Sequence, residues 1–239
     1  MRKNYHDQLT LSTLYAYSEH YILTLGNRDV GSLNEFMAKL PGDEKQKLAQ
    51  VREAYSYMMV HPGCKMMAPG TDMPEGLAKC IQALNTLYKS SPALYQMDDE
   101  YDGFEWVQLM KYEENVITFL RKTEKPEETL LVICNFAAIP YENYQVGVPF
   151  AGKYKEIFNS DAVEFGGEGV VNSRVKTAKA EECDEREYSI KVKLSALGVS
   201  IYSCTPGKAP ARKKVTAAKT AKDKTAKDKI AGKLVRTVK

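Results

Sequence analysis

The sequence predicts an α+β protein, and three observations support that fold class. Residues 1–90 carry apolar side chains at helical spacing, whereas residues 91–206 contain short β-branched and aromatic runs separated by turn residues. Residues 207–239 are rich in lysine and alanine and offer little to bury. We therefore expect a mostly helical first domain, an antiparallel β-sandwich as the second domain, and a disordered basic tail.

The first domain is expected to mix helices with short strands. Leu11, Leu14 and Tyr15 lie at the spacing of one helical face, and the apolar run at residues 21–25 is typical of a short strand. A second short strand, which we expect to be buried, is predicted at residues 64–68. Both strands would lie within the helical part of the chain.

Two longer helices are predicted before residue 90. The first should be Glu44–Val60, because Asp43 can accept hydrogen bonds from its first free amides and His61-Pro62-Gly63 stops it. The second should span residues 73–89. The inward face of the first helix is expected to hold Leu48, Val51, Arg52, Tyr55, Met58 and Met59, and that of the second Leu77, Cys80, Ile81, Leu84, Leu87 and Tyr88.

Six runs in the second domain are typical of strands, because they are β-branched or aromatic and are bounded by turn residues such as Asp102-Gly103. They span residues 104–110, 116–122, 129–136, 144–149, 153–159 and 188–204. Gly166-Gly167-Glu168-Gly169 is expected to be a mobile loop. It does not resemble a dinucleotide-binding fingerprint, because no strand-turn-helix pattern surrounds it.

The composition is that of an ordinary soluble protein, with 44% hydrophobic and 27% charged residues. No apolar run approaches the ~20 residues that cross a bilayer, and the N-terminus lacks the apolar core of a signal peptide. We therefore expect a cytoplasmic protein without a membrane partner. The five cysteines and three histidines are scattered, so we expect no metal site, no cofactor and no histidine-based nucleophilic triad.

The net charge of +3 conceals two unlike parts. Residues 207–239 hold twelve basic residues and two aspartates, a net charge of +10, whereas residues 1–206 carry −7. Lysine-rich segments attract phosphate polymers, and this tail resembles those of linker-histone-like bacterial proteins. We interpret the tail either as a binder of nucleic acid or another polyanion, or as a solubilising extension or readthrough of a decayed gene end.

Five segments carry a family resemblance. They are LTLSTLYAYSEHYILTL at 9–25, KLPGDEKQKLAQVREAYSYMMVHPGCKMM at 39–67, SPALYQMDDEYDGFEWV at 91–107, LLVICNFAAIPYENYQVGVPFAGKYKEIFNSDAVEFGGEGVVN at 130–172 and LSALGVSIYS at 194–203. In these segments the chain resembles the C-terminal third of glycogen (1,4-alpha-glucan) branching enzymes. These enzymes belong to the alpha-amylase superfamily, whose members combine a (β/α)8 barrel with a C-terminal all-β domain. The resemblance implies that residues 1–90 are the last units of a partial, truncated barrel and residues 91–206 the all-β domain.

The family cuts an α-1,4-glucan and transfers the released chain to a 6-hydroxyl, making an α-1,6 branch. Its retaining mechanism uses an aspartate nucleophile, a glutamate acid/base and a second aspartate that stabilises the transition state. The first two lie upstream of the resembling region, which implies that this chain alone is inactive. The alternatives are a separate upstream barrel polypeptide that this chain completes, or a non-catalytic interaction protein that binds α-glucan or, through its tail, a polyanion.

The transition-state aspartate of the family falls within range of this chain. The family reads Ser-His-Asp-Glu-Val-Val-His-Gly-Lys there, and alignment without a gap places Asn27 on the histidine, Arg28 on the aspartate and Asp29 on the glutamate. An arginine has the wrong charge to stabilise an oxocarbenium cation, so no catalytic residue is secure. Asp29 either takes the aspartate position by a one-residue shift or caps the next helix. Asp72 lies near the glutamate of a later family motif, and Asn27, Asp29 and Asp72 are the candidate substrate-binding residues.

Family matches in the second domain favour structural roles. Trp106, in Gly-Phe-Glu-Trp, is expected in the core rather than stacked on a sugar. Asn135, Asn159 and Asp161, in Cys-Asn-Phe and Phe-Asn-Ser-Asp, are expected at turns and strand ends. Three tyrosines either pack within the sheets or offer exposed rings to a glucan: Tyr141, Tyr144 and Tyr154.

Overall fold

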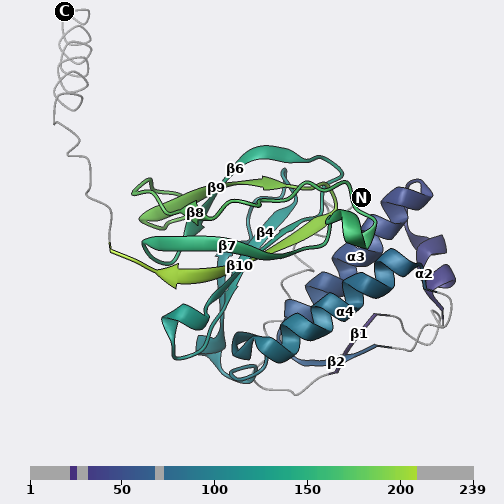
Figure 1. Cartoon of the computed structure of the whole chain (residues 1–239), viewed down its shortest axis with the longest axis horizontal. Coiled ribbons are helices and arrows are strands. Elements are labelled where there is room, and N and C mark those ends of the chain that lie inside the picture. Colours follow the sequence, from purple (N-terminus) through teal and green to yellow (C-terminus); the bar gives the residue numbers. More distant parts are fainter. Residues whose placement is uncertain (1–21, 26–31, 68–72, 209–239) are drawn as a thin grey trace, which may run out of the picture. The chain divides into compact units, whose positions relative to one another are not determined.

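The computed structural model describes residues 22–25, 32–67 and 73–208 (Figure 1). They belong to one compact unit that runs to Ala209, and the second unit, Pro210–Lys239, lies outside the described residues. The described part has a few helices followed by mostly antiparallel strands. In that part of the chain, no helix combines the length and the apolar character that crossing a membrane would require.

The helical region contains one parallel pair of strands. β1 (Ile22–Thr24) lies beside β2 (Cys64–Met66), with Ile22 opposite Cys64. Parallel strands need a crossover connection, and α2 (Leu33–Lys39) and α3 (Glu44–Val60) lie between them in the chain. The prediction that the second strand is buried is wrong, because Cys64 is exposed and Met66 is 53% exposed. The described part of this sheet has only two strands, so its outward-facing residues remain accessible.

The helices begin at side-chain caps. In α3, Asp43 Oδ1 accepts the amide of Gln46 at 2.8 Å, and Gln46 Oε1 accepts the amide of Asp43 at 3.1 Å. This capping box confirms the predicted start of the helix. The short helix α2 is capped by Ser32, whose hydroxyl accepts the amide of Glu35 at 3.3 Å. The N-cap of α2 is thus Ser32, whereas Asp29, the other candidate for this role, lies outside the described residues.

The buried faces of α3 and of α4 (Glu75–Ser90) differ from the predicted apolar stripes. Leu48 and Tyr55 are only half-buried, as are three of the predicted residues of α4, Ile81, Leu87 and Tyr88. The buried face of α3 instead includes the polar residues Gln50, Glu53 and Ser56. Hydrophobic spacing misses these positions because α3 packs partly against polar turns as well as against the sheet, as the hydrogen bond from Arg52 to the Ser160 carbonyl illustrates.

The strands of the second region form two antiparallel sheets, one of six strands in the order β3-β4-β5-β10-β7-β8 and one of two strands, β6-β9. Their bounds are β3 (Phe104–Gln108), β4 (Val116–Arg121), β5 (Leu130–Asn135), β6 (Tyr141–Val148), β7 (Gly152–Asn159), β8 (Lys176–Thr177), β9 (Tyr188–Leu194) and β10 (Gly198–Pro206). The single run predicted at 188–204 is two strands, because Leu197 adopts a φ of 51° in the turn between them. The short β8 was not predicted.

The six-stranded sheet is covered on both faces (Figure 1). One face packs against α3 and α4 through a core that includes Met59, Leu84 and Phe119. The other face packs against β6 and β9 through a core that includes Leu120 and Val192. Neighbouring residues of β4 thus point into different cores, as alternation along a strand requires. The helices and the sandwich therefore share one of the two cores.

A β-bulge in β7 changes which face its side chains occupy. Ile201 of β10 pairs with Phe158, whereas the next residue, Tyr202, pairs with Glu156, which leaves Ile157 as an extra residue. Tyr154 consequently packs on the β6-β9 side and Phe158 on the helix side. Regular alternation would place these two residues, four positions apart, on the same face.

Candidate functional site

Four predicted site residues lie outside the described residues: Asn27, Arg28, Asp29 and Asp72. Their roles therefore stay predictions. The two described strands that precede them end at Thr24 and Met66. Because β1 and β2 are parallel and paired, their carboxyl ends lie at the same edge of the sheet. In barrel enzymes of the α/β class that edge carries the active-site loops.

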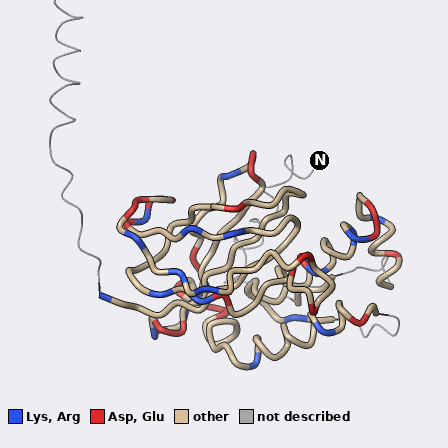
Figure 2. Tube along the Cα trace, turned by 45° about the horizontal axis from the view of Figure 1, so that its top comes forward, with Lys and Arg blue, Asp and Glu red and all other residues tan. Residues whose placement is uncertain are grey.

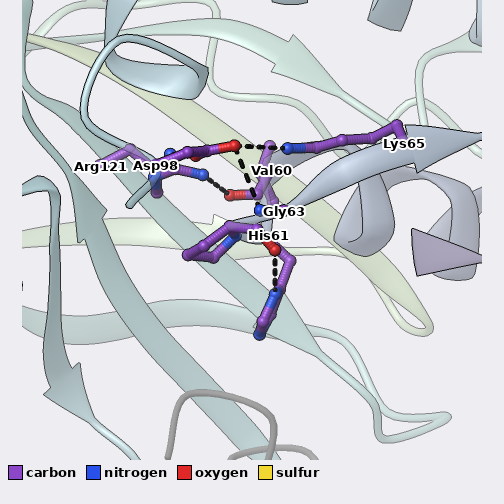
Figure 3. A network of polar contacts seen from close by, with 7 residues as sticks. Val60, His61, Gly63, Lys65, Asp98 and Arg121 are labelled. Carbon is purple, nitrogen blue, oxygen red and sulfur yellow. Dashed lines mark hydrogen bonds and ion pairs between the residues drawn. The ribbon is translucent and has the colours of Figure 1, made fainter. Parts of the chain in front are cut away.

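A buried polar network connects β2 with the six-stranded sheet (Figure 3). The carboxylate of Asp98 is its centre: it pairs with Arg121 of β4, accepts the amide of Gly63 at 3.1 Å and lies 3.4 Å from Nζ of Lys65. Arg121 Nη1 also donates to the carbonyl of Val60 at 2.7 Å. The network thus joins the end of α3, strand β2 and strand β4.

Burial shifts the pKa values of two groups in this region. Desolvation lowers the pKa of Lys65 to about 8, although the nearby Asp98 carboxylate opposes the shift. Desolvation also lowers the pKa of His61 to about 4. The His61 ring packs edge-on against Tyr57 at 5.4 Å, and its Nδ1 lies 3.0 Å from the carbonyl of Pro62, to which it donates. His61 is therefore neutral at pH 7.

Perturbed pKa values mark either catalytic groups or buried ion pairs. The side chains of Lys65, Asp98 and Arg121 are 6%, 14% and 0% exposed, and they already pair with one another. A ligand would have to break these contacts to reach them. We therefore interpret the network as a structural anchor. The network is not evident from the sequence because its members are far apart in the chain, and the only signal is an arginine at the end of an apolar strand.

Asp161 organises the glycine-rich turn after β7. Its carboxylate accepts the amides of Glu168 at 2.9 Å and Val170 at 3.0 Å, and its carbonyl accepts the amide of Gly169 at 2.8 Å. Asn159 Oδ1 in turn accepts the amide of Asp161 at 2.9 Å. These contacts confirm the predicted turn and strand-end roles of Asn159 and Asp161. They also correct the expected mobile loop, because its backbone is held around one carboxylate.

Asn135 has a comparable role at the end of β5. Its Nδ2 donates to the carbonyls of Ile139 at 2.9 Å and Ser195 at 2.7 Å, while its Oδ1 accepts the amide of Ala137 at 3.1 Å. The side chain is fully buried, and all three contacts go to backbone atoms. The predicted turn role is therefore confirmed.

The aromatic side chains considered as sugar contacts mostly pack within the protein. Trp106 is half-buried, with its ring 4.8 Å from Phe104 and 5.5 Å from Phe119, which confirms a packing role. Tyr144 and Tyr154 are 7% and 0% exposed, so the alternative of rings offered to a glucan is wrong for both. The half-buried Tyr141 packs against the ring of Tyr144 at 5.4 Å.

The described residues form no evident site for thiol or metal chemistry. The five cysteines are free, and Cys80, Cys134 and Cys204 are buried. Burial raises the pKa of Cys80 to about 12, which disfavours a reactive thiolate. No group of histidine, cysteine and acidic side chains capable of holding a metal ion occurs in residues 22–25, 32–67 and 73–208.

The chain is similar in sequence to one protein family and to several curated enzymes. Residues 106–205 match the family described as alpha amylase, C-terminal all-beta domain. The chain is 36% identical to the 1,4-alpha-glucan branching enzyme GlgB of Oceanobacillus iheyensis, over 84% of this chain and 35% of that enzyme. It is 33% identical to the GlgB of Geobacillus stearothermophilus, again over 84% of this chain and 35% of the enzyme.

A solved structure shows that the fold is shared more widely. The MutB enzyme, in a crystal structure of a mutant in complex with the substrate sucrose, aligns with a TM-score of 0.51 at 9% identity, over 85% of this chain and 46% of that chain. At that identity the likeness concerns the fold alone. The chain spans about a third of the length of the curated relatives it matches. Over that third it is similar to the 1,4-alpha-glucan branching enzymes GlgB, and residues 106–205 match the alpha amylase, C-terminal all-beta domain.

Proposed function

We propose that this chain corresponds to the C-terminal third of a glycogen branching enzyme and works in cytoplasmic α-glucan metabolism. The observation that carries the proposal is the extent of the sequence identity. It covers 84% of the chain, and the all-β match covers only residues 106–205, so the identity also includes the helical region. A chance likeness of two β-sandwiches would not extend into those helices.

The helical region supports an origin as the end of a (β/α)8 barrel. β1 and β2 are parallel, helices lie between them in the chain, and α4 follows β2, as in successive barrel units. Parallel sheets are normally covered on both faces, yet Ile22 and Met66 are 60% and 53% exposed. These exposed residues fit a sheet whose faces the rest of a barrel would cover. We therefore propose residues 1–90 as barrel units, 91–206 as the all-β domain and 207–239 as a basic tail.

We further propose that the 239 residues alone do not form α-1,6 branches. The resemblance places the nucleophile and the acid/base upstream of this region, and Arg28 stands where the family has its transition-state aspartate. A polypeptide carrying the preceding barrel strands would have to supply the missing carboxylates. Asn27, Asp29 and Asp72 would then be the contribution of this chain to substrate binding.

Incubation of the purified chain with amylose tests this proposal. Branches are counted after enzymatic debranching, with and without a coexpressed upstream barrel polypeptide. We expect no branches from the chain alone. Branching by the isolated chain would contradict its inactivity, and failure of the upstream polypeptide to copurify would argue against a split enzyme.

Native electrophoresis in gels with and without glycogen tests glucan binding separately. The full chain runs beside a chain ending at Lys208, which keeps all of β10. Retardation of both by glycogen would support an α-glucan site in the described part. Unchanged migration of a folded sample would contradict glucan binding.

The charge distribution favours a second candidate function, the binding of nucleic acid or another polyanion by residues 207–239. In the described part, basic and acidic residues are interspersed (Figure 2), whereas the tail has a net charge of +10. Binding through such a tail should weaken steeply as salt increases. A DNA-binding titration at two salt concentrations, with the chain ending at Lys208 as control, tests it. Equal DNA binding by both chains would exclude the tail as the source.

A further inference from the structure

We propose that a small hollow beside α3 binds one terminal sugar unit of an α-glucan chain, an inference that rests on the proposed function. The hollow has a volume of ≈ 140 Å³ and lies between α3, the glycine-rich turn after β7 and the turns at the ends of β5 and β9. Small residues such as Ala49, Ala138 and Gly166 form part of its wall, so it stays open. Pockets for whole ligands are usually ~300–1,000 Å³, so this one suits a single unit.

Arg52 supplies the donor groups of the hollow. The residue is 5% exposed, and its Nε donates to the carbonyl of Ser160 at 2.9 Å. That is the only hydrogen bond its side chain makes within the described ranges. Its Nη1 lies 3.9 Å from the position that a Cβ on Gly166 would occupy. The two Nη atoms make no hydrogen bond with the described residues and are not sealed from solvent, so their N–H groups can donate to acceptor oxygens of a ligand in the hollow.

The charges around the hollow favour a neutral ligand over an anion. Lys45 and Glu168 form an ion pair at its rim, and the Asp161 carboxylate is already bound by two backbone amides. The two cations and two carboxylates of its lining therefore cancel. A phosphate or carboxylate would meet the negative charges of Asp161 and Glu168. A sugar hydroxyl can instead accept from Arg52 and donate to a carboxylate at the same time.

Electrostatics support a permanently charged Arg52. Burial lowers the pKa of its guanidinium, but the nearby carboxylates of Asp161 and Glu168 oppose that shift. Arginine keeps its proton at neutral pH under such conditions. The fork of N–H groups therefore remains available to two neighbouring hydroxyl oxygens of one pyranose ring.

Two glycines in the same turn provide a matched pair of variants. Gly166 and Gly169 have φ values of +79° and +82°, a region that asparagine tolerates. Gly166→Asn would place a side chain in front of Arg52 without removing the bond to Ser160. In Gly169→Asn the new Cβ would instead meet the side chain of Val163 at 2.9 Å, and that side chain is 72% exposed and free to move.

The test is an NMR titration of the full ¹⁵N-labelled chain with maltotriose and, separately, with inorganic phosphate. We expect maltotriose to shift the Gly166 and Gly167 amides in the wild type and in Gly169→Asn, with affinity at least about tenfold weaker in Gly166→Asn. Equal binding by all three proteins, or a response of these amides to phosphate but not maltotriose, would overturn the proposal.

Native electrophoresis in gels with glycogen distinguishes a failure of this inference from a failure of the proposed function on which it rests. If glycogen retards the wild-type chain while maltotriose leaves the two amides unchanged, α-glucan binding stands and the hollow is not its site. If neither glycogen nor maltotriose binds to the folded chain, glucan binding itself fails, and this inference fails with it.

Discussion

Asp98 supplies a carboxylate partner to three groups: the guanidinium of Arg121, the ammonium of Lys65 and the amide of Gly63. Removing two charges from water costs several kcal/mol per ion, and the attraction between them offsets this only when the contacts are complete. Such a network adds little net stability while it is intact. Its loss is costly, because Arg121 has no exposed surface through which water can solvate its charge.

Asp98→Asn should therefore destabilise the protein by about 3 kcal/mol, because the charge of Arg121 loses its partner in the interior. Combining it with Arg121→Met should recover part of that loss, since the uncompensated charge is then removed. The measurement is the free energy of urea unfolding. Glu75→Gln, which breaks the exposed pair with Lys79, is the matched control and should leave the stability nearly unchanged, because solvent screens that pair. Additive effects of the two core substitutions would contradict this account.

His61 should make stability depend on pH. Its pKa is about 4 in the folded protein and 6.5 in an unfolded chain, so between these values protons bind mainly to the unfolded state. The contribution is fully present above pH 6.5 and is lost as the pH falls towards 4. From pH 7 to pH 5 we expect a loss of about 2 kcal/mol.

Urea unfolding of the wild type and of His61→Gln at pH 7 and pH 5 measures this contribution. The variant cannot titrate at residue 61, so its stability should fall less between the two pH values. The other histidines, His6 and His20, are common to both proteins and cancel in the comparison. Identical pH dependence of the two proteins would show that His61 is accessible to protons in the folded state.

Among the elements, α3 connects several parts of the described unit. Its start is fixed by Asp43 and Gln46, its middle donates from Arg52 to the turn after β7, and its end accepts from Arg121. One face contributes Met59 and Val60 to the core shared with the sheet. The helix therefore joins the parallel strand pair, the sandwich and the hollow beside Gly166.

Asp43→Ala should cost about 1 kcal/mol, because the amide of Gln46 loses its acceptor at the start of α3. Asp43→Asn keeps an acceptor oxygen at this position and should retain most of the stability. Thermal unfolding of the three proteins, followed by circular dichroism at 222 nm, provides the comparison. If both variants lose equal stability, the charge rather than the hydrogen bond caps the helix.

How far the sequence predicts an element depends on whether its determinants are local. The bounds of α3 could be predicted because a capping residue and a proline mark its two ends. The faces of β7 could not, because the bulge at Ile157 arises from pairing with β10, 44 residues further along the chain. The anchor around Asp98 escaped prediction for the same reason. Asn135 and Asp161 were predicted correctly because their partners lie mostly in adjacent turns.

At the scale of the whole described unit, the helices are a structural layer of the sandwich. The core between them combines residues of α3 and α4 with residues of β3, β4, β5, β7 and β10. Phe119, Val132 and Ile201 face the helices and are fully buried. Separation of residues 91–206 from the helical region would expose these side chains to water. The free-energy cost is about 1.5–3 kcal/mol for each side chain that becomes fully exposed.

A fragment of residues 91–208 should therefore be much less stable than residues 1–208. We expect it to bind a hydrophobic dye such as ANS and to lack a cooperative thermal transition, because one face of its main sheet is uncovered. The chain of residues 1–208, which keeps the helices, is the control and should unfold in a single transition. Cooperative unfolding of both at one temperature would show that the sandwich folds independently of α3 and α4.

The position of β10 affects the order in which the protein can form during synthesis. This strand is the last of the described elements, yet it lies between β5 and β7 and is hydrogen-bonded to both. Until it leaves the ribosome, β3, β4 and β5 cannot join β7 and β8, and both groups expose strand edges prone to aggregation. The sheet is thus completed only after nearly the whole described chain is available, so early translation arrest should yield polypeptides that depend on chaperones.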